Sequence, residues 1–94
     1  MTYVLLIHNV EDYDKWKQGY DEHGAMRKKE GSQGAFVFRN SENPKQMVVM
    51  TNWEDLESAR NFAESKELIN TMKSAGVKGK PEVYYLDEIE RTPY

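Results

Sequence analysis

Residues 5–16 read LLIHNVEDYDKW, where a run of aliphatic side chains passes into a polar stretch that can start a helix. Over residues 3–10, apolar side chains stand at both odd and even positions. Successive side chains of a strand point to opposite faces of a sheet, so both faces of this strand are expected to be buried. Asp12 suits the N-cap of a helix that begins at Tyr13. This stretch therefore predicts a strand covered on both sides and followed directly by a helix.

The segment after Asp12 has the pattern of an amphipathic helix. Its larger apolar side chains recur at spacings of three and four residues. They are Tyr13, Trp16, Tyr20 and Met26, and His23 lies among them. Three basic residues then precede Gly31, which suits the end of a helix. We therefore expect one helix from residue 13 to residue 30.

The rest of the chain alternates between strand and helix signals. The stretches AFVFRN (35–40) and QMVVMTNW (46–53) are typical of strands, and Asn43 and Pro44 between them suit a turn. A second helical region begins near Asp55 and breaks before Ser65, which can cap a further helix. Residues 74–81 predict a loop and residues 82–90 a last strand, while residues 91–94 form a tail.

The order of these elements is β-α-β-β-α-β. This order predicts an α+β, ferredoxin-like fold in one domain over residues 1–90, with a four-stranded antiparallel sheet that carries its helices on one face. The other face also holds apolar side chains and needs a cover. A second copy of the sheet, packed face to face about a two-fold axis, is the simplest cover. We expect a homodimer formed by sheet-to-sheet packing; the alternative is a monomer with a partly apolar open sheet.

Composition excludes several classes of protein. The 94 residues are 38% hydrophobic and 31% charged, which suits one globular domain. The net charge is -3 with scattered basic residues, so no nucleic-acid partner is expected. The absence of cysteine excludes thiolate chemistry and Cys-ligated metals. The apolar run at residues 4–7 is far shorter than the roughly 20 residues of a membrane span and has no signal-peptide features, so a cytoplasmic protein without a membrane partner is expected.

Three segments carry a resemblance to a known superfamily. They are HNVEDYDKWKQGYDEH (8–23), FRNSENPKQMVVMTNWEDLESARNFAES (38–65) and LINTMKSAGVKGKPEVYYLDE (68–88). On these segments the chain resembles the dimeric α+β barrel superfamily over residues 2–90. This superfamily includes antibiotic biosynthesis monooxygenases, haem-degrading monooxygenases and small polyketide cyclases. The resemblance implies a dimeric α+β barrel. It does not identify the reaction, because this superfamily carries out several unrelated chemistries on one scaffold.

The resemblance also implies candidate residues. Cofactor-independent monooxygenases of this superfamily use an Asn and a Trp in a cavity between sheet and helices; Asn9 and Trp53 are the matching types, although Asn9 has the parity of the outer face. Such enzymes often carry a His in the helix after the third strand, and residues 53–68 contain none. This departure disfavours quinol oxidation and haem degradation. Related cyclases use cavity histidines and tyrosines as acid–base groups, which His8, Tyr20 and His23 match in type.

Strand parity gives His8 a specific place. His8 shares its parity with Val4 and Leu6, which we assign to the face that the helices cover. Its imidazole would then point toward Tyr20 and His23, and an imidazole with a pKa of about 6.5 can give or take a proton near neutral pH. These three residues are therefore candidate catalytic groups for proton transfer next to a carbonyl. The alternative is a structural His8 bonded to a backbone carbonyl or to a carboxylate.

Two functions stay open. The first is a monooxygenase or cyclase that acts without metal or bound cofactor on a small aromatic or polyketide-like molecule. The second is a non-catalytic ligand-binding or assembly protein on the same fold. A cavity beside His8 would favour the enzyme, and a solidly filled helix–sheet interface would favour the second function. The histidines lack metal-ligand spacing, so no metal site is expected. Four large side chains are candidate ligand contacts: Trp16, Trp53, Phe62 and Met72.

Overall fold

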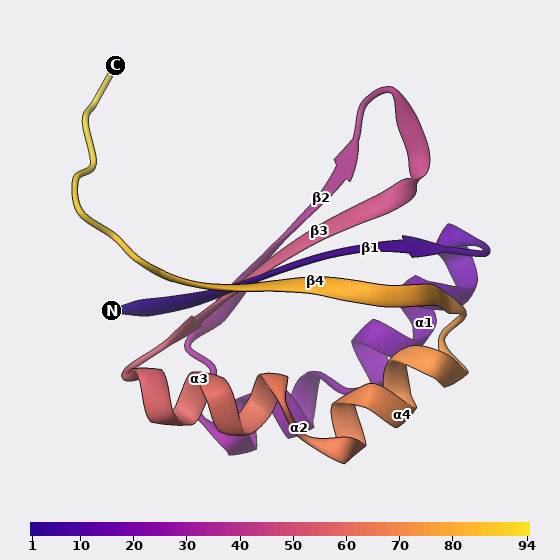
Figure 1. The fold of residues 1–94 in the computed structure, drawn as a ribbon, viewed down its shortest axis with the longest axis horizontal. Coiled ribbons are helices and arrows are strands. Elements are labelled where there is room, and N and C mark those ends of the chain that lie inside the picture. Colours follow the sequence, from indigo (N-terminus) through magenta and orange to yellow (C-terminus); the bar gives the residue numbers. More distant parts are fainter.

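The computed structural model describes all 94 residues. Its elements, in chain order, are β1 (Thr2–Val10), α1 (Tyr13–Glu22), α2 (Gly24–Glu30), β2 (Gly34–Asn40), β3 (Asn43–Trp53), α3 (Leu56–Ala63), α4 (Lys66–Ser74) and β4 (Val77–Asp87). The strands form one antiparallel sheet in the order β2-β3-β1-β4. All the helices cover the same face of this sheet (Figure 1). The predicted ferredoxin-like α+β fold is confirmed.

The single helix expected over residues 13–30 is wrong, because the structure has two helices there. α1 ends at Glu22 and α2 begins at Gly24, with His23 as the cap residue between them. The Nδ1 atom of His23 lies 3.0 Å from the carbonyl oxygen of Gly19, and glycine at position 24 has a low helix propensity. The apolar spacing continues across this break, so the pattern alone could not reveal it.

The hairpin turn and the last strand also differ from expectation. The β2–β3 turn lies at Ser41 and Glu42, so Asn43 and Pro44 belong to β3 instead of the turn. β4 covers residues 77–87, so the loop expected over residues 74–81 and the strand end expected at residue 90 are wrong. Gly79, with φ of 70°, sits where the β1–β4 register shifts between Ile7 and Asn9. Gly79 fits the bulge in β4, and Pro81 is tolerated because β4 is an edge strand of the sheet, although both residues had suggested a loop.

One face of the sheet forms the core with the helices. The buried strand residues on this face are Thr2, Val4, Leu6, His8 and Val10 of β1 and Met47, Val49, Thr51 and Trp53 of β3. Trp16 of α1, Phe62 of α3 and Leu68 of α4 complete the core from the helices. The even positions of β1 therefore face the helices, as strand parity predicted.

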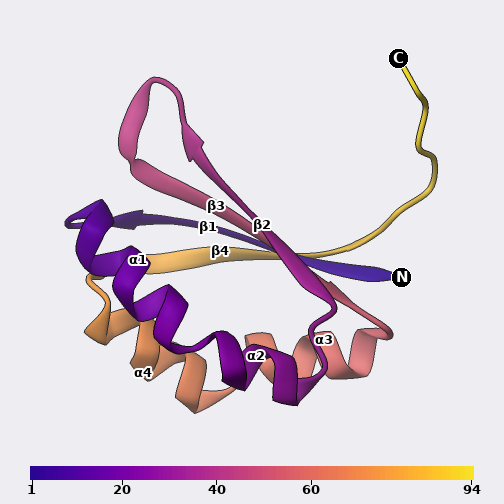
Figure 2. The same cartoon turned by 180° about the vertical axis from the view of Figure 1, so that it is seen from behind.

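The opposite face, which we call the open face, carries a continuous apolar surface without a cover. Cross-strand pairing places Phe36 beside Met50 and Met50 beside Leu5, and it likewise places Phe38 beside Val48. Phe36 and Phe38 are 50% and 52% exposed, and their rings stack with centroids 6.3 Å apart. No helix lies over this face in the reverse view either (Figure 2). None of the helices has the length and apolar character needed to cross a membrane.

Candidate functional site

A cavity of about 50 Å³ lies between the sheet and the helices. Its sheet side is formed by Leu6, His8, Val49 and Thr51. Its helical side includes Trp16, Tyr20, His23, Met26, Arg27, Phe62, Leu68, Thr71 and Met72. Of the seven site residues expected from the sequence, all except Trp53 line this cavity. The fold thus gathers side chains from four helices and two strands around one small space.

His8 is the buried titratable group of the cavity. It is 5% exposed, and its Nδ1 atom is buried without a hydrogen-bond partner. Burial lowers the pKa of His8 below its usual 6.5, because a buried imidazolium loses hydration. The imidazole is therefore neutral at pH 7 and can accept a proton. A buried polar atom without a partner costs free energy, which is a common feature of sites where a ligand supplies the missing contact.

Four side chains follow one another along one side of the cavity, and we call them the stacked wall: His8, which is tilted against Trp16, then Trp16, Tyr20 and Arg27, which stack in turn. The ring centroids of His8 and Trp16 are 5.8 Å apart, and those of Trp16 and Tyr20 are 5.2 Å apart. The guanidinium carbon of Arg27 lies 3.7 Å from the Tyr20 ring centroid. The stacked wall runs from the sheet to the junction of α1 and α2 and gives this side of the cavity an aromatic lining.

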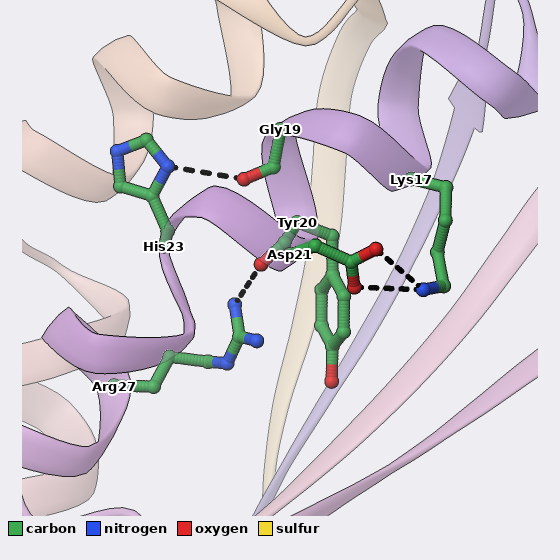
Figure 3. Close-up of polar contacts among 6 residues, drawn as sticks. All are labelled: Lys17, Gly19, Tyr20, Asp21, His23 and Arg27. Carbon is green, nitrogen blue, oxygen red and sulfur yellow. Dashed lines mark hydrogen bonds and ion pairs between the residues drawn. The ribbon is translucent and has the colours of Figure 1, made fainter.

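His23 is tied on both sides of its ring. The carbonyl of Gly19 can only accept, so Nδ1 of His23 donates to it, as Figure 3 shows. In the neutral ring, Nε2 then accepts from the hydroxyl of Thr71 at 3.0 Å. These two bonds link the α1–α2 junction to α4. A proton transfer through His23 would have to open one of them, which makes His8 the freer acid–base group.

Trp53 lies outside the cavity, at the end of β3. It is 0% exposed, and its indole Nε1 donates to the hydroxyl oxygen of Thr51 at 2.8 Å. Its ring also packs against Phe62, with centroids 4.8 Å apart. Trp53 therefore holds two side chains that do line the cavity, and its effect on a ligand would pass through them. Asn9 is exposed on the other face of β1 and does not line the cavity.

Sequence reasoning missed Thr51 and Arg27 as cavity residues. Thr51 shares the parity of Val49 and Trp53 on β3, so strand alternation could have found it. Arg27 follows Tyr20 by seven residues, a helical spacing, but as one of three basic residues near Gly31 it was interpreted as a charge at a helix end. Burial lowers the pKa of Arg27, and no carboxylate lies within ion-pair distance of it.

Met72 separates the cavity from a surface groove. The groove has a volume of about 500 Å³ between α4 and β4 and is lined by Ile69, Val77, Pro81 and Val83, among others. Met72 is the single residue that lines both spaces. Ligand pockets usually measure about 300–1,000 Å³, so the cavity alone is too small for a ring system. Met72 has a flexible side chain, so it is the candidate gate between the cavity and the groove.

The charged groups around the site do not form a metal cluster. No group of three or more His, Asp or Glu side chains lies close enough together to hold a metal ion. The carboxylate of Asp21, next to Tyr20 in the sequence, pairs with Lys17 at 2.7 Å, and both side chains are partly exposed (Figure 3). No acidic side chain lines the cavity.

Comparisons with known proteins agree with this architecture. The family model described as antibiotic biosynthesis monooxygenase matches residues 11–74. A comparison with curated protein sequences found no match. Among solved structures, SnoaB, a cofactor-independent oxygenase from Streptomyces nogalater, superposes with a TM-score of 0.79 at 11% identity, over 99% of this chain and 97% of SnoaB.

Two further structures show the same likeness. A candidate antibiotic biosynthesis monooxygenase from Bordetella bronchiseptica has a TM-score of 0.79 at 15% identity, over 95% of this chain and 97% of its own. A second candidate, from Caulobacter crescentus, has a TM-score of 0.74 at 14% identity, over 95% of this chain and 90% of its own. At these identities the structural likeness shows a shared fold.

Proposed function

The chain belongs to the antibiotic biosynthesis monooxygenase family, and we propose that it is an enzyme whose helix–sheet cavity takes a small aromatic or polyketide-like molecule. In this proposal it acts as a monooxygenase or a cyclase, without a bound metal or cofactor. His8 is its acid–base group. SnoaB, which shares the fold, is described as a cofactor-independent oxygenase, and this supports the oxygenase form of the proposal.

The observation that carries the proposal is the buried, unpartnered His8 beside an aromatic wall. A neutral imidazole can take a proton from a phenol, or from a carbon next to a carbonyl, and leave a delocalised anion. In a monooxygenase, that anion reduces dioxygen, of which one oxygen atom enters the product and the other leaves as water. In a cyclase, the anion attacks a carbonyl of the same molecule, and the resulting alkoxide takes the proton back from His8. The apolar surroundings favour both routes, because they exclude water that would compete for the proton or the anion.

The other cavity residues have supporting roles in this proposal. Trp16 and Tyr20 give the ligand apolar contact, and the Tyr20 hydroxyl is a second candidate for proton transfer. Phe62 and Met72 close the cavity from the side of α3 and α4, and Met72 gives access from the surface groove. His23 holds the α1–α2 junction in place through its two hydrogen bonds. Trp53 acts indirectly, through Thr51 and Phe62.

Binding and turnover of aromatic compounds test the proposal. Aromatic acids, quinols and haem are screened for a rise in melting temperature, because a compound that binds only the folded state must raise it. Oxygen uptake and product chromatography then follow each binder, without added flavin or metal. We expect His8→Ala to lower turnover at least 100-fold while the protein stays folded. Asn9→Ala, on the exposed side of the same strand, is the matched control and keeps the activity.

Two results would contradict the proposal. One is a screen in which no aromatic compound binds. The other is a His8→Ala variant that binds and turns over a ligand as well as the original protein does.

The open face supports a homodimer as part of the proposal. Its apolar side chains, including Phe36 and Phe38, lie over all four strands, and two such sheets can pack face to face at about 10 Å. A contact of this kind would remove Phe36 and Phe38 from water. The cavity lies on the other side of the sheet, so each subunit would keep a complete cavity of its own.

One observation favours a second function. The cavity of about 50 Å³ has room for a few water molecules only, as expected for a nearly filled interior. This favours a non-catalytic assembly protein in which Trp16, Tyr20, Phe62 and Met72 serve mainly as core. The screen separates the two functions, because an assembly protein would dimerise without binding any of the aromatic compounds.

A further inference from the structure

Arg27 brings a permanent positive charge to the cavity, which no Lys, Asp or Glu side chain lines. It lies on α2, is half-buried, and lines both the cavity and a shallow surface groove beside Gly24 and Ser32. Its guanidinium stacks on the ring of Tyr20, and Nη1 donates to the backbone carbonyl of Tyr20 at 2.9 Å (Figure 3). The stacking and the hydrogen bond hold the guanidinium plane in one orientation at the end of the stacked wall.

No carboxylate forms an ion pair with Arg27, and Asp21, whose charge acts on Arg27, is itself paired with Lys17. The ion pairs of the structure are Lys15–Glu11, Lys17–Asp21 and Arg91–Glu88, and none of them includes Arg27. A guanidinium has five N–H donors, of which the protein uses one here. Removing a charge from water costs free energy unless an opposite charge compensates it, and burial accordingly lowers the pKa of Arg27.

The surroundings of Arg27 favour a negatively charged ligand group. No Asp or Glu side chain lines the cavity, and the carboxylate of Asp21, whose charge acts on Arg27, is paired with Lys17. His8, at the other end of the stacked wall, is buried and lacks a partner for Nδ1. Between these two residues lie the rings of Trp16 and Tyr20. A molecule complementary to this arrangement has a flat apolar ring and an anionic group that reaches Arg27.

We propose that the cavity binds a planar aromatic molecule that carries a carboxylate, and that Arg27 pairs with this carboxylate at the cavity mouth. The planar fork of a guanidinium suits the two oxygens of a carboxylate, and free N–H donors are available. Arg27 is thus a specificity residue that selects acids over neutral analogues. This inference rests on the proposed function, because it assigns the substrate class of the same cavity.

The competing role for Arg27 is purely structural. Its bond to the Tyr20 carbonyl satisfies a carbonyl near the end of α1, where helices leave such groups unpaired. In that case Arg27 would stabilise the α1–α2 junction and would have no preference for ligand charge. The two roles differ in one measurable respect, which is the affinity ratio between an acid and its neutral amide.

Binding of matched probes separates the roles. The probes are 4-hydroxybenzoate and 6-hydroxy-2-naphthoate, each compared with its amide, and calorimetry at pH 7.5 measures affinity. We expect the original protein to bind at least one acid 10-fold or more tightly than its amide. Arg27→Gln should remove this preference by weakening acid binding, with amide binding unchanged, and Arg27→Lys should keep part of it. Lys29→Gln is the matched control, because it removes the same charge from an exposed site two residues away.

Three other outcomes would overturn the inference, and they can be told apart. If the acid and the amide bind equally, the anion preference is refuted while the cavity remains a ligand site. If Arg27→Gln weakens both probes equally and lowers the melting temperature, the role of Arg27 is structural. If no probe binds the original protein, both this inference and the proposed function fail for these ring sizes. His8→Ala, measured alongside, should weaken the acid and the amide by the same factor, since its effect does not depend on the carboxylate.

Discussion

The imidazole of His8 and the indole of Trp16 meet across the helix–sheet interface, with ring centroids 5.8 Å apart and ring planes inclined by 55°. His8 lies near the end of β1 and Trp16 in the second turn of α1. Only Glu11 and Asp12 connect the two elements. Asp12 caps α1, because its carboxylate accepts from the Lys15 backbone N–H at 3.0 Å. The contact shields His8 from water, so it affects both the stability and the proposed chemistry of the protein.

Protein stability should depend on pH through His8. Burial lowers the pKa of His8 in the folded state, so below about pH 6.5 the unfolded chain binds more protons than the folded protein. The neutral His8 therefore makes its full contribution to the free energy of unfolding above this pH. This contribution is lost as the pH falls from about 6.5 toward the lowered pKa of the folded state. Urea unfolding at pH 7.5 and pH 5.5 measures the loss. His8→Gln should lose less over this interval, whereas an equal loss in both proteins would contradict the prediction.

Replacement of Trp16 by alanine should destabilise the fold strongly. Trp16 is 4% exposed and belongs to the main hydrophobic cluster, and large-to-alanine changes at such sites cost about 3–5 kcal/mol. Chemical denaturation measures the change in the free energy of unfolding. Leu56→Ala is the control, because Leu56 is 42% exposed and its loss should change stability by about 0.5 kcal/mol or less. Similar values for the two variants would show that Trp16 is not part of the core.

Gly19 should be a position where alanine destabilises a helix. A Cβ atom at residue 19 would lie 2.9 Å from the Cβ of Ala75, which marks the close approach of α1 and α4. Overpacking costs about 1–3 kcal/mol, which exceeds the gain of about 0.5–1 kcal/mol from replacing a helical glycine by alanine. Thermal unfolding should show a lower melting temperature for Gly19→Ala.

Two further variants check the cause of this effect. Gly19→Ala combined with Ala75→Gly should recover most of the lost stability, because the contacting methyl group is removed. Gly24→Ala should be neutral or stabilising, since its nearest contact would be an ordinary 3.6 Å to Arg27. A Gly19→Ala variant that is more stable than the original protein would disprove the close packing of α1 on α4.

The proposed homodimer predicts sensitivity of the open face to charge. Sedimentation at micromolar concentration should give a species of twice the 11.0 kDa chain mass. Phe38→Lys should shift it to the monomer mass, because the lysine charge would be buried without a partner between the sheets. Leu56→Lys, the same kind of change on the helical side, should leave the mass unchanged. A monomer for the original protein would refute the dimer.

Local periodicity in the sequence determined the order of the elements and the two faces of β1. Alternation along a strand and spacing along a helix are properties of neighbouring residues, so they placed His8, Trp16, Tyr20 and Phe62 on surfaces that face one another. Capping preference, which is also a local property, identified Ser65 as a cap, and the structure confirms that its hydroxyl accepts from the Leu68 backbone N–H.

Only the tertiary structure decided how these faces meet. His23 ends α1 while bonding to Thr71, 48 residues away, and no local pattern carries such a pairing. Long-range packing likewise leaves Trp53 outside the cavity and stacks Arg27 on Tyr20 without a carboxylate partner. The cavity volume depends on how side chains from six elements fill a shared space. Apolar periodicity determines which side of an element is buried, but the contacts between elements determine which polar atoms remain unpaired, and those atoms define the site.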